Sequence, residues 1–343
     1  MKLAQTTARR IVLASRPRGR AALTDFRVEE TDLPDPKSGE MLLRVEYLSL
    51  DPYMRGRMED RQSYAPSVAI GEVMPAESVA TVIASQHPDY NDGEAVLAFT
   101  GWCTHALSDG SNVRKVGGSQ TPVTTRLGVL GMPGFTAYAG LRLIGKPKPN
   151  ETVVVAAASG PVGSLVGQLA KIAGARAVGI AGGPKKCLYI TEDLGFDAAI
   201  DRRDSNFPAA LRSACPNGID VYFENVGGAI WQAVIPLLNQ FARVPICGLI
   251  AQYDEANAGE DGLTATMRAI LSKSLTLRGY INYEFTEDFY DEFLHDIAQG
   301  IRDGSIRYRE DIVDGFDNVR AAFLAMLDGR NFGKVIVKLV ENS

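Results

Sequence analysis

Residues 151–186 read ETVVVAAASGPVGSLVGQLAKIAGARAVGIAGGPKK, and this stretch decides the fold of the chain. Its first part, Val153 to Ala158, is an unbroken run of β-branched and small apolar residues, typical of a strand buried on both faces of a parallel sheet. A glycine-bearing turn follows, and residues 162–172 then have the apolar spacing of an amphipathic helix. Residues 176–181 form a second apolar run, so the stretch predicts a βαβ unit that binds a dinucleotide.

The turn after the first strand carries the glycines that such a site needs. Ala158, Gly160 and Gly163 occupy the three glycine positions of the pattern G-x-G-x-x-G, with alanine in place of the first. Gly160 lets the backbone approach a pyrophosphate, Gly163 lets the helix pack closely on the strand, and the helix N-terminus offers N–H groups to the anion. The residues expected to bind the cofactor here are Gly160, Pro161, Val162, Gly163 and Ser164.

The end of the second strand indicates which dinucleotide is bound. Sites for NAD usually place an acidic residue about 20 residues beyond the glycine turn, where it bonds the ribose 2′-hydroxyl. This chain instead has Gly182, Gly183 and Pro184 followed by Lys185 and Lys186. With no carboxylate to repel a 2′-phosphate and two ammonium groups to attract it, NADP is favoured over NAD. Lys185 by itself is also explained as a solvated residue at the start of the next helix.

Length and composition describe an ordinary globular chain. With 343 residues, 45% hydrophobic and 22% charged, it is long enough for two domains and a sizeable core. A net charge of -5 gives no reason to expect nucleic acid or an anionic membrane as a partner. No apolar run reaches the roughly 18 residues of a membrane span, and the run at residues 11–14 is too short for a signal peptide. We therefore expect a cytoplasmic protein.

The cysteines and histidines give poor material for a metal site. The four cysteines and three histidines are dispersed, and no two cysteines have the C-x-x-C spacing. Cys103 and His105 can face the same side of a strand, but two ligands without a third more often pack than bind zinc. We expect no metal.

Beyond the βαβ unit, helices and strands continue to alternate, which predicts a doubly wound parallel sheet. Ligands of such sheets bind at the carboxyl ends of the strands, which places Asn225, Gly227, Cys247 and Gly248 where a cofactor can lie. The expected helices are 185–194, 206–214, 231–238 and 287–302, and the expected strands are 198–200, 219–224, 241–248 and 275–281.

The flanking segments indicate a β-rich module. The first 120 residues or so have short apolar runs separated by Pro and Gly, as antiparallel strands and turns do. The tail predicts a helix over 318–327 and a strand within 329–339 that can return to this module. The fold class is therefore α/β, with a Rossmann sheet inserted into a β-rich domain. The expected domains are residues 1–130 with 305–343, and residues 131–304 for NADP binding.

Two tyrosines fall close together in the loop-rich part of this module. Because Pro52 disfavours helix at Asp51, Tyr53 is expected to begin a short turn or helix just after a strand. Tyr64 follows in the same region. Their hydroxyl-tipped rings can line a ligand pocket, or they can be ordinary half-buried tyrosines.

Six motifs are spread along nearly the whole chain. They are Asp51-Pro-Tyr-Met-Arg55, Gly134-Phe-Thr-Ala-Tyr138, residues 157–164 with Gly167-Gln-Leu-Ala-Lys171, Gly195-Phe-Asp-Ala-Ala199, Tyr222-Phe-Glu-Asn-Val-Gly-Gly228, and Gly329-Arg-Asn-Phe-Gly-Lys334. Together they resemble the motifs of one family, the zinc-free medium-chain dehydrogenase/reductases, in the branch of prostaglandin reductases, plant alkenal double-bond reductases and bacterial NADPH-dependent curcumin reductases. The zinc-dependent relatives carry Gly-His-Glu where this chain has Gly71-Glu72.

The resemblance implies a GroES-like β domain around a Rossmann domain, NADP(H) as cofactor, and a homodimer. It implies that Lys186 holds the 2′-phosphate. A family tyrosine that helps to hold it is replaced here by Asp201-Arg202-Arg203, so Arg202 is expected to make that contact. Further cofactor contacts are expected from Asn225, Cys247, Gly248, Tyr253, Tyr280, Ile281, Asn331 and Gly182.

The chemistry that follows is reduction of a carbon–carbon double bond conjugated to a carbonyl. Without a metal Lewis acid a plain alcohol is a hard substrate, whereas an enolate oxygen needs only one or two hydroxyl donors. We expect Tyr253, or the cofactor ribose hydroxyl that it orients, to supply the proton, with Tyr53 and Tyr64 shaping the enone pocket. The alternatives are a quinone reductase of the same architecture and a non-enzymatic NADPH-binding or redox-sensing protein.

Overall fold

The computed structural model describes residues 6–116, 121–253 and 262–339. The chain divides into two compact units: Met1–Leu127 together with Glu310–Ser343, and Gly128–Arg309. The second unit is therefore inserted in the sequence of the first. Within these described residues, no helix combines the length and apolar character needed to cross a membrane.

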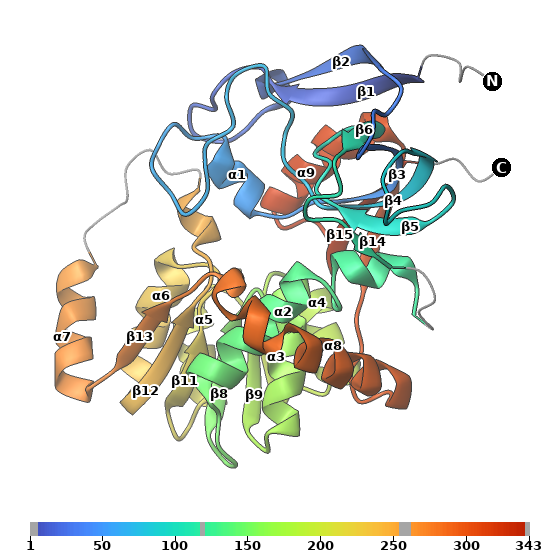
Figure 1. Cartoon of the computed structure of the whole chain (residues 1–343). Helices are drawn as coiled ribbons and strands as arrows, with labels where there is room; N and C mark the ends of the chain where they lie inside the picture. The colour runs from blue at the N-terminus through green and yellow to red at the C-terminus, as the bar shows by residue number, and fades with distance from the viewer. Residues whose placement is uncertain (1–5, 117–120, 254–261, 340–343) are drawn as a thin grey trace. The chain divides into compact units, whose positions relative to one another are not determined.

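The inserted unit is built on six parallel strands in the order β10-β9-β8-β11-β12-β13 (Figure 1). The crossover from β8 through helix α3 to β9 is the βαβ unit that residues 151–186 predict. The strands are β8 Thr152–Ala156, β9 Arg176–Ala181, β10 Ala198–Asp201, β11 Ile219–Phe223, β12 Leu238–Ile246 and β13 Thr276–Gly279. The helices are α2 Met132–Ala139, α3 Pro161–Ile172, α4 Pro184–Glu192, α5 Phe207–Ala214, α6 Gly228–Val234, α7 Leu263–Lys273 and α8 Thr286–Asp303.

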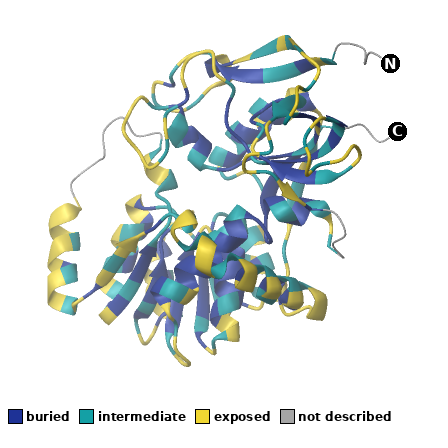
Figure 2. Ribbon diagram, viewed as in Figure 1, coloured by how far each residue is buried: buried dark blue, intermediate teal, exposed yellow. Residues whose placement is uncertain are grey.

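Both faces of this sheet are covered, as the apolar run in β8 requires. All five residues of β8 are buried (Figure 2). Val153 and Val155 pack in one core with residues of α2, α3 and α8, whereas Val154 and Ala156 pack in a second core with residues of α5, α6 and α7. Because successive side chains of a strand point to opposite faces, helices cover both sides and the sheet is doubly wound.

Several expected boundaries differ from the observed ones. The first strand ends at Ala156, not Ala158, because Ala157 has a left-handed backbone with φ of 53° that turns the chain. Helix α6 begins at Gly228 and a 3₁₀ turn, Ile235–Leu237, ends it, so the helix expected over 231–238 is displaced. Strand β12 accordingly begins at Leu238, three residues earlier than expected.

The other unit contains a two-stranded sheet and a seven-stranded sheet. Strand β15 pairs antiparallel with β3, so the C-terminal strand returns to the N-terminal module as the sequence predicts. The expected fold class, a parallel α/β sheet inserted into a β-rich domain, is confirmed. The strands are β1 Thr6–Leu13, β2 Phe26–Leu33, β3 Met41–Ser49, β4 Ser78–Ser85, β5 Ala95–Ala98, β6 His105–Ser108, β7 Arg114–Lys115, β14 Glu310–Asp314 and β15 Lys334–Lys338. The helices are α1 Tyr53–Arg57 and α9 Val319–Leu327.

Two details of this unit bear on the sequence interpretation. The short helix expected at Tyr53 is present as α1. Cys103 lies outside β6, which begins at His105, so these two residues do not share the strand that would have aligned them.

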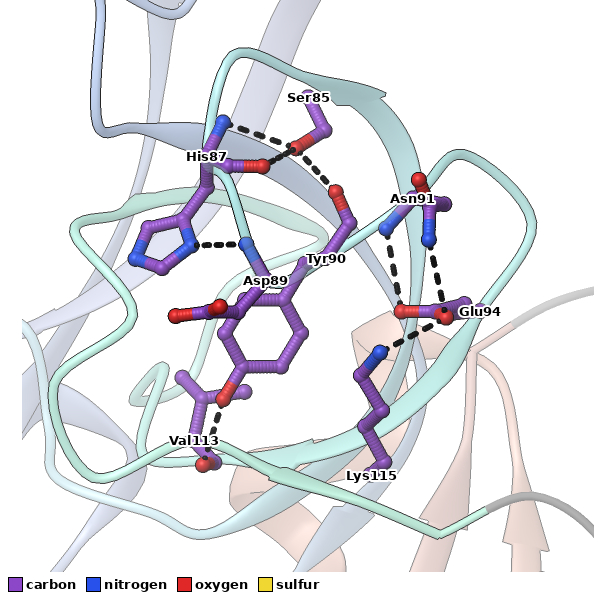
Figure 3. Close-up of polar contacts among 8 residues, drawn as sticks. All are labelled: Ser85, His87, Asp89, Tyr90, Asn91, Glu94, Val113 and Lys115. Carbon is purple, nitrogen blue, oxygen red and sulfur yellow. Dashed lines mark hydrogen bonds and ion pairs between the residues drawn. The ribbon is translucent and has the colours of Figure 1, made fainter.

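The loop from β4 to β5 is fixed by polar contacts within it and with residues 113–115 (Figure 3). The Ser85 hydroxyl donates to the carbonyl of Tyr90 at 2.7 Å, and the Tyr90 hydroxyl donates to the carbonyl of Val113 at 2.8 Å. Lys115 donates to Glu94 at 2.9 Å. These contacts order a surface loop that carries none of the expected site residues.

Candidate cofactor-binding site

The glycine turn between β8 and α3 has the geometry that a pyrophosphate site needs. Gly160 is extended, with φ of -82° and ψ of 171°, and Pro161 is the first helical residue, where its missing N–H costs nothing. The amide of Gly160 donates to the carbonyl of Ala157 at 2.9 Å, and the amide of Ser164 donates to the carbonyl of Gly160 at 3.0 Å. The N–H groups of Val162 and Gly163 precede any intrahelical acceptor and are available to an anion.

Gly163 is required by packing rather than by its dihedral angles. A Cβ at Gly163 would lie 2.5 Å from the carbonyl oxygen of Ala157 and 2.8 Å from the Cα of Ala158, and both atoms belong to the backbone. At Gly160 the nearest atom to such a Cβ is the same oxygen, at 3.3 Å. The structure therefore assigns the close helix–strand approach to Gly163, as the sequence predicts.

The turn after β11 is held by a buried carboxylate. Glu224, only 2% exposed, accepts from the amides of Val226 at 2.6 Å and Gly227 at 2.8 Å, and from the Tyr222 hydroxyl at 3.0 Å. Burial raises the pKa of Glu224 despite these donors. Glu224 was not among the residues expected at the site, although its place at the end of a buried strand was a usable signal.

Asn225 joins the carboxyl ends of three neighbouring strands. Its Nδ2 donates to the carbonyl of Ala156 at 2.8 Å, and its Oδ1 accepts from the Cys247 thiol at 2.7 Å. These bonds orient the amide and leave its second N–H for a ligand. Burial and the charge of Glu224 raise the pKa of Cys247 to about 12, so the thiol stays protonated and can donate.

The loop after β12 is tied to the same turn. The amide of Gly248 donates to the carbonyl of Glu224 at 3.3 Å, and the amide of Ile250 donates to that of Asn225 at 3.3 Å. Tyr253 ends the 3₁₀ turn Ile250–Gln252, and its amide donates to the carbonyl of Ile250 at 3.3 Å. The following residues, 254–261, lie outside the described residues.

Tyr280 and Ile281 follow β13 at the same end of the sheet. The Tyr280 ring is 5% exposed and its hydroxyl donates to the carbonyl of Thr136 at 2.7 Å. Its side chain therefore belongs to the core. Ile281 is partly exposed, and its amide donates to Glu284 at 2.7 Å.

The turn after β9 lies against two arginine side chains, one of which, Arg202, was expected at the 2′-phosphate. A Cβ at Gly182 would lie 3.2 Å from Nε of Arg203 and 3.4 Å from Nε of Arg202, so both guanidinium groups lie against this turn. Asp201 accepts from the amides of Gly183 at 2.8 Å and Arg203 at 2.9 Å. Burial raises the pKa of Asp201, but these N–H groups and the two arginine charges outweigh it and lower the pKa.

Arg202 was expected at the 2′-phosphate, whereas Arg203, its neighbour in the sequence, was not. Lys186, whose amide donates to the carbonyl of Gly183 at 3.2 Å, lies in the first turn of α4 beside the same glycines.

The remaining expected residues belong to the other unit. Burial, followed by the carboxylates of Asp51 and Glu77, raises the pKa of Tyr53 far above its ordinary value. Tyr64, 53% exposed, interacts electrostatically with Tyr53, so these two tyrosines are neighbours as expected. Asn331 donates through Nδ2 to the carbonyl of Gly333 at 2.8 Å.

A buried charge cluster beside Tyr53 was missed at the sequence level. Lys334 donates to the carbonyl of Leu50 at 2.8 Å and to the carboxylate of Asp51 at 2.5 Å. In this ion pair the Lys334 side chain is 3% exposed and the Asp51 side chain 6%. Burial, then the charge of Asp51, raises the pKa of Glu77 to about 7, although Lys334 opposes the shift. The two motifs that hold Asp51 and Lys334 are far apart in the sequence, and pairing of β15 with β3 brings them together.

Comparison with known proteins places this geometry in a family. The profile described as "N-terminal domain of oxidoreductase" matches residues 9–116, and the profile described as "Zinc-binding dehydrogenase" matches residues 161–299. The NADPH-dependent curcumin reductase of Escherichia coli is 48% identical over 333 residues, 96% of each chain. The chain belongs to the medium-chain dehydrogenase/reductase family. Within that family it is also similar to prostaglandin reductase 1 of Bos taurus, at 39% identity over 92% of this chain and 94% of that protein.

Solved structures agree with this family membership. The structure of CurA from Vibrio vulnificus in complex with NADPH has a TM-score of 0.94 at 48% identity, covering 97% of this chain and all of that one. Among the residues that the structure describes, no group of three or more His, Cys, Asp or Glu side chains is arranged to hold a metal ion.

Proposed function

We propose that this protein is an NADPH-dependent reductase of carbon–carbon double bonds conjugated to a carbonyl. The observation that carries the proposal is the 48% identity, over 96% of both chains, to a protein named as an NADPH-dependent curcumin reductase. The residues fit the cofactor: Gly163 permits the close approach of α3 to the strand that precedes the glycine turn, and Arg202 and Arg203 lie against Gly182, where a 2′-phosphate is expected.

The proposed residue roles follow from what the reaction needs. Bound NADPH supplies a hydride to the β-carbon of the substrate. The glycine turn binds the pyrophosphate, Lys186 and Arg202 bind the 2′-phosphate, and Asn225 presents its remaining amide N–H to the cofactor. Negative charge then collects on the carbonyl oxygen, where hydroxyl donors stabilise it as an enolate.

Tyr253 is proposed as the residue that controls proton delivery. It donates the proton to the α-carbon, directly or through the ribose hydroxyl that it orients. Tyr53 and Tyr64 form the wall of the enone pocket, a role that the electrostatic interaction between them supports. A homodimer is also part of the proposal, to be checked by light scattering on the purified protein.

The test is oxidation of NADPH, with NADH in parallel, against enones, alkenals and quinones. We expect fast turnover with NADPH and enones and little with NADH. Turnover of benzoquinones with none of open-chain enones would replace the proposal by a quinone reductase. Binding of NADPH without turnover of any acceptor would leave a cofactor-binding protein in its place.

The Tyr253→Phe variant tests the proton step. Loss of a general acid costs on the order of 100-fold in kcat, with NADPH affinity little changed. Tyr283→Phe is the matched control, because Tyr283 is 62% exposed and has no proposed role. If Tyr253→Phe keeps kcat within about twofold of Tyr283→Phe, the role given to Tyr253 is wrong.

A further inference from the structure

Gln168 is a buried residue of the motif Gly167-Gln-Leu-Ala-Lys171. The proposed reaction assigns it no role. Its side chain lies on α3, one turn beyond Ser164, and is only 4% exposed. A buried amide is retained where its hydrogen bonds are made, so its partners indicate what it does.

One end of the Gln168 amide touches the proposed cofactor site. Nε2 donates to the carbonyl of Ser164 at 3.0 Å. Ser164 is in the first turn of α3, where its own amide donates to the carbonyl of Gly160 at 3.0 Å. Gln168 is therefore one hydrogen bond from the glycine turn.

The same amide also holds a distant segment. Nε2 also donates to the carbonyl of Arg307 at 2.9 Å, and Oε1 accepts from the amide of Arg307 at 2.7 Å. Both hydrogens of the Gln168 amide are thus used, and its oxygen binds the same residue that one of them binds. This two-point contact spans 139 positions of sequence and fixes the backbone of Arg307 in place.

Arg307 lies on the return crossover, defined here as residues 305–309. This segment runs from the end of α8 to β14, and so connects the inserted unit back to the β-rich unit. The crossover also contacts α4, the helix that begins beside Gly182 and Gly183: Arg307 donates to the carbonyl of Asp193 at 3.3 Å, and the Arg309 guanidinium lies 5.9 Å from the Tyr189 ring centre. Its anchors are therefore the two helices whose N-termini form the proposed cofactor site.

We propose that Gln168 is a positioning residue that couples occupancy of the cofactor site to the conformation of the return crossover. An anion bound at the N-terminus of α3 restrains the first helical turn and with it the Ser164 carbonyl. Gln168, held by that carbonyl, then keeps Arg307 in its hydrogen-bonded state for a larger fraction of the time. The proposal rests on the cofactor site proposed above.

The Arg307 amide is a direct reporter, because its N–H is the group that Gln168 binds. Hydrogen exchange of the crossover peptide is measured with and without saturating NADP⁺. In the wild type, NADP⁺ slows exchange at Arg307 by at least about threefold. Gln168→Leu speeds exchange in the free protein by about tenfold, as expected for loss of a buried hydrogen bond, and abolishes the response of Arg307 to NADP⁺. The first turn of α3 still responds to NADP⁺.

Two further variants keep the test sharp. Gln168→Glu retains an acceptor for the Arg307 amide but loses both donors. It should also lose most of the response of Arg307 to NADP⁺, and it replaces Gln168→Leu in the test if the leucine variant does not fold. Lys171→Gln removes an exposed ion pair with Asp197 from the same helix and keeps the wild-type response.

The outcomes separate the coupling from the cofactor site. If NADP⁺ binds by calorimetry but leaves exchange at Arg307 unchanged in the wild type, Gln168 has a structural role only and the coupling is refuted. Retention of the full response in Gln168→Leu refutes it equally. If NADP⁺ does not bind at all, the proposed cofactor site fails and the coupling fails with it.

Discussion

Removing the charge of Asp51 tests the buried cluster around Lys334. The Asp51→Asn variant keeps the shape of the side chain but leaves an ammonium group that is only 3% exposed without its ion-pair partner. Breaking a buried pair in this way costs roughly 3–5 kcal/mol, because the remaining charge is uncompensated. Glu77 is close enough to interact with Lys334 and can ionise in response, so we expect a loss near the lower end, about 3 kcal/mol.

Urea unfolding followed by tryptophan fluorescence measures this loss. Trp102 is fully buried in the same unit, and a Trp231→Phe background makes Trp102 the single reporter. With a slope of about 2 kcal/mol per molar urea, the midpoint should fall by about 1.5 M. Asp328→Asn is the control: it weakens exposed ion pairs with Arg20 and Arg330 and should cost less than about 1 kcal/mol.

A double variant decides whether the buried charge is the cause. Asp51→Asn combined with Lys334→Met removes the ammonium as well, and should recover at least half of the lost stability because the unpaired cation is gone. A loss below about 1 kcal/mol for Asp51→Asn, or no recovery in the double variant, would refute this account of the cluster.

Two further predictions concern a glycine and a titrating carboxyl. Gly163→Ala should weaken NADPH binding at least tenfold, because the added Cβ would lie 2.5 Å from a backbone oxygen. Calorimetry measures the affinity of this variant and of the control Gly279→Ala, whose added Cβ would have no atom within 4 Å. Equal affinities of the two variants for NADPH would contradict the prediction. Glu77 has a folded-state pKa of about 7 against an ordinary 4.5, so its contribution to stability is present below about pH 4.5 and is lost as the pH rises through 7. Between pH 5 and 8 the free energy of unfolding of the wild type should therefore fall by about 2 kcal/mol more than that of Glu77→Gln, after discounting for partial exposure. Urea midpoints at each pH measure the difference. Parallel pH profiles of the two proteins would contradict the raised pKa of Glu77.

The parts of the fold that could be predicted are those whose signal is local. Strand β9 was expected at residues 176–181 and is observed there, because an apolar run between two glycines defines it without reference to the rest of the chain. Helix α7 was not predicted: Leu263, Met267 and Leu271 are all exposed, so its apolar spacing does not mark a buried face. Strand β14, with the sequence EDIVD, was also missed, because pairing with β15 rather than hydrophobic alternation defines it.

The candidate site also contains parts with a local sequence signal and parts without one. The glycine turn and the basic turn after β9 were predicted because each lies within a few residues of sequence. The Glu77 and Lys334 cluster and the contact of Gln168 with Arg307 depend on segments that meet only after folding. Motif resemblance named the segments that hold Gln168 and Lys334 but did not say what they touch.

The electrostatics of Tyr53 and Glu77 constrain how the proposed pocket can work. A hydroxyl whose pKa is far above the working pH keeps its proton, so Tyr53 can donate a hydrogen bond to an enolate oxygen but is a poor source of the proton itself. Proton delivery to carbon is therefore assigned to another group, in keeping with the role proposed for Tyr253. Because Glu77 interacts electrostatically with Tyr53 and titrates near pH 7, the charge beside this donor changes within the physiological range. A negative charge there opposes the developing oxyanion, so the pocket is better suited to its reaction when Glu77 is protonated.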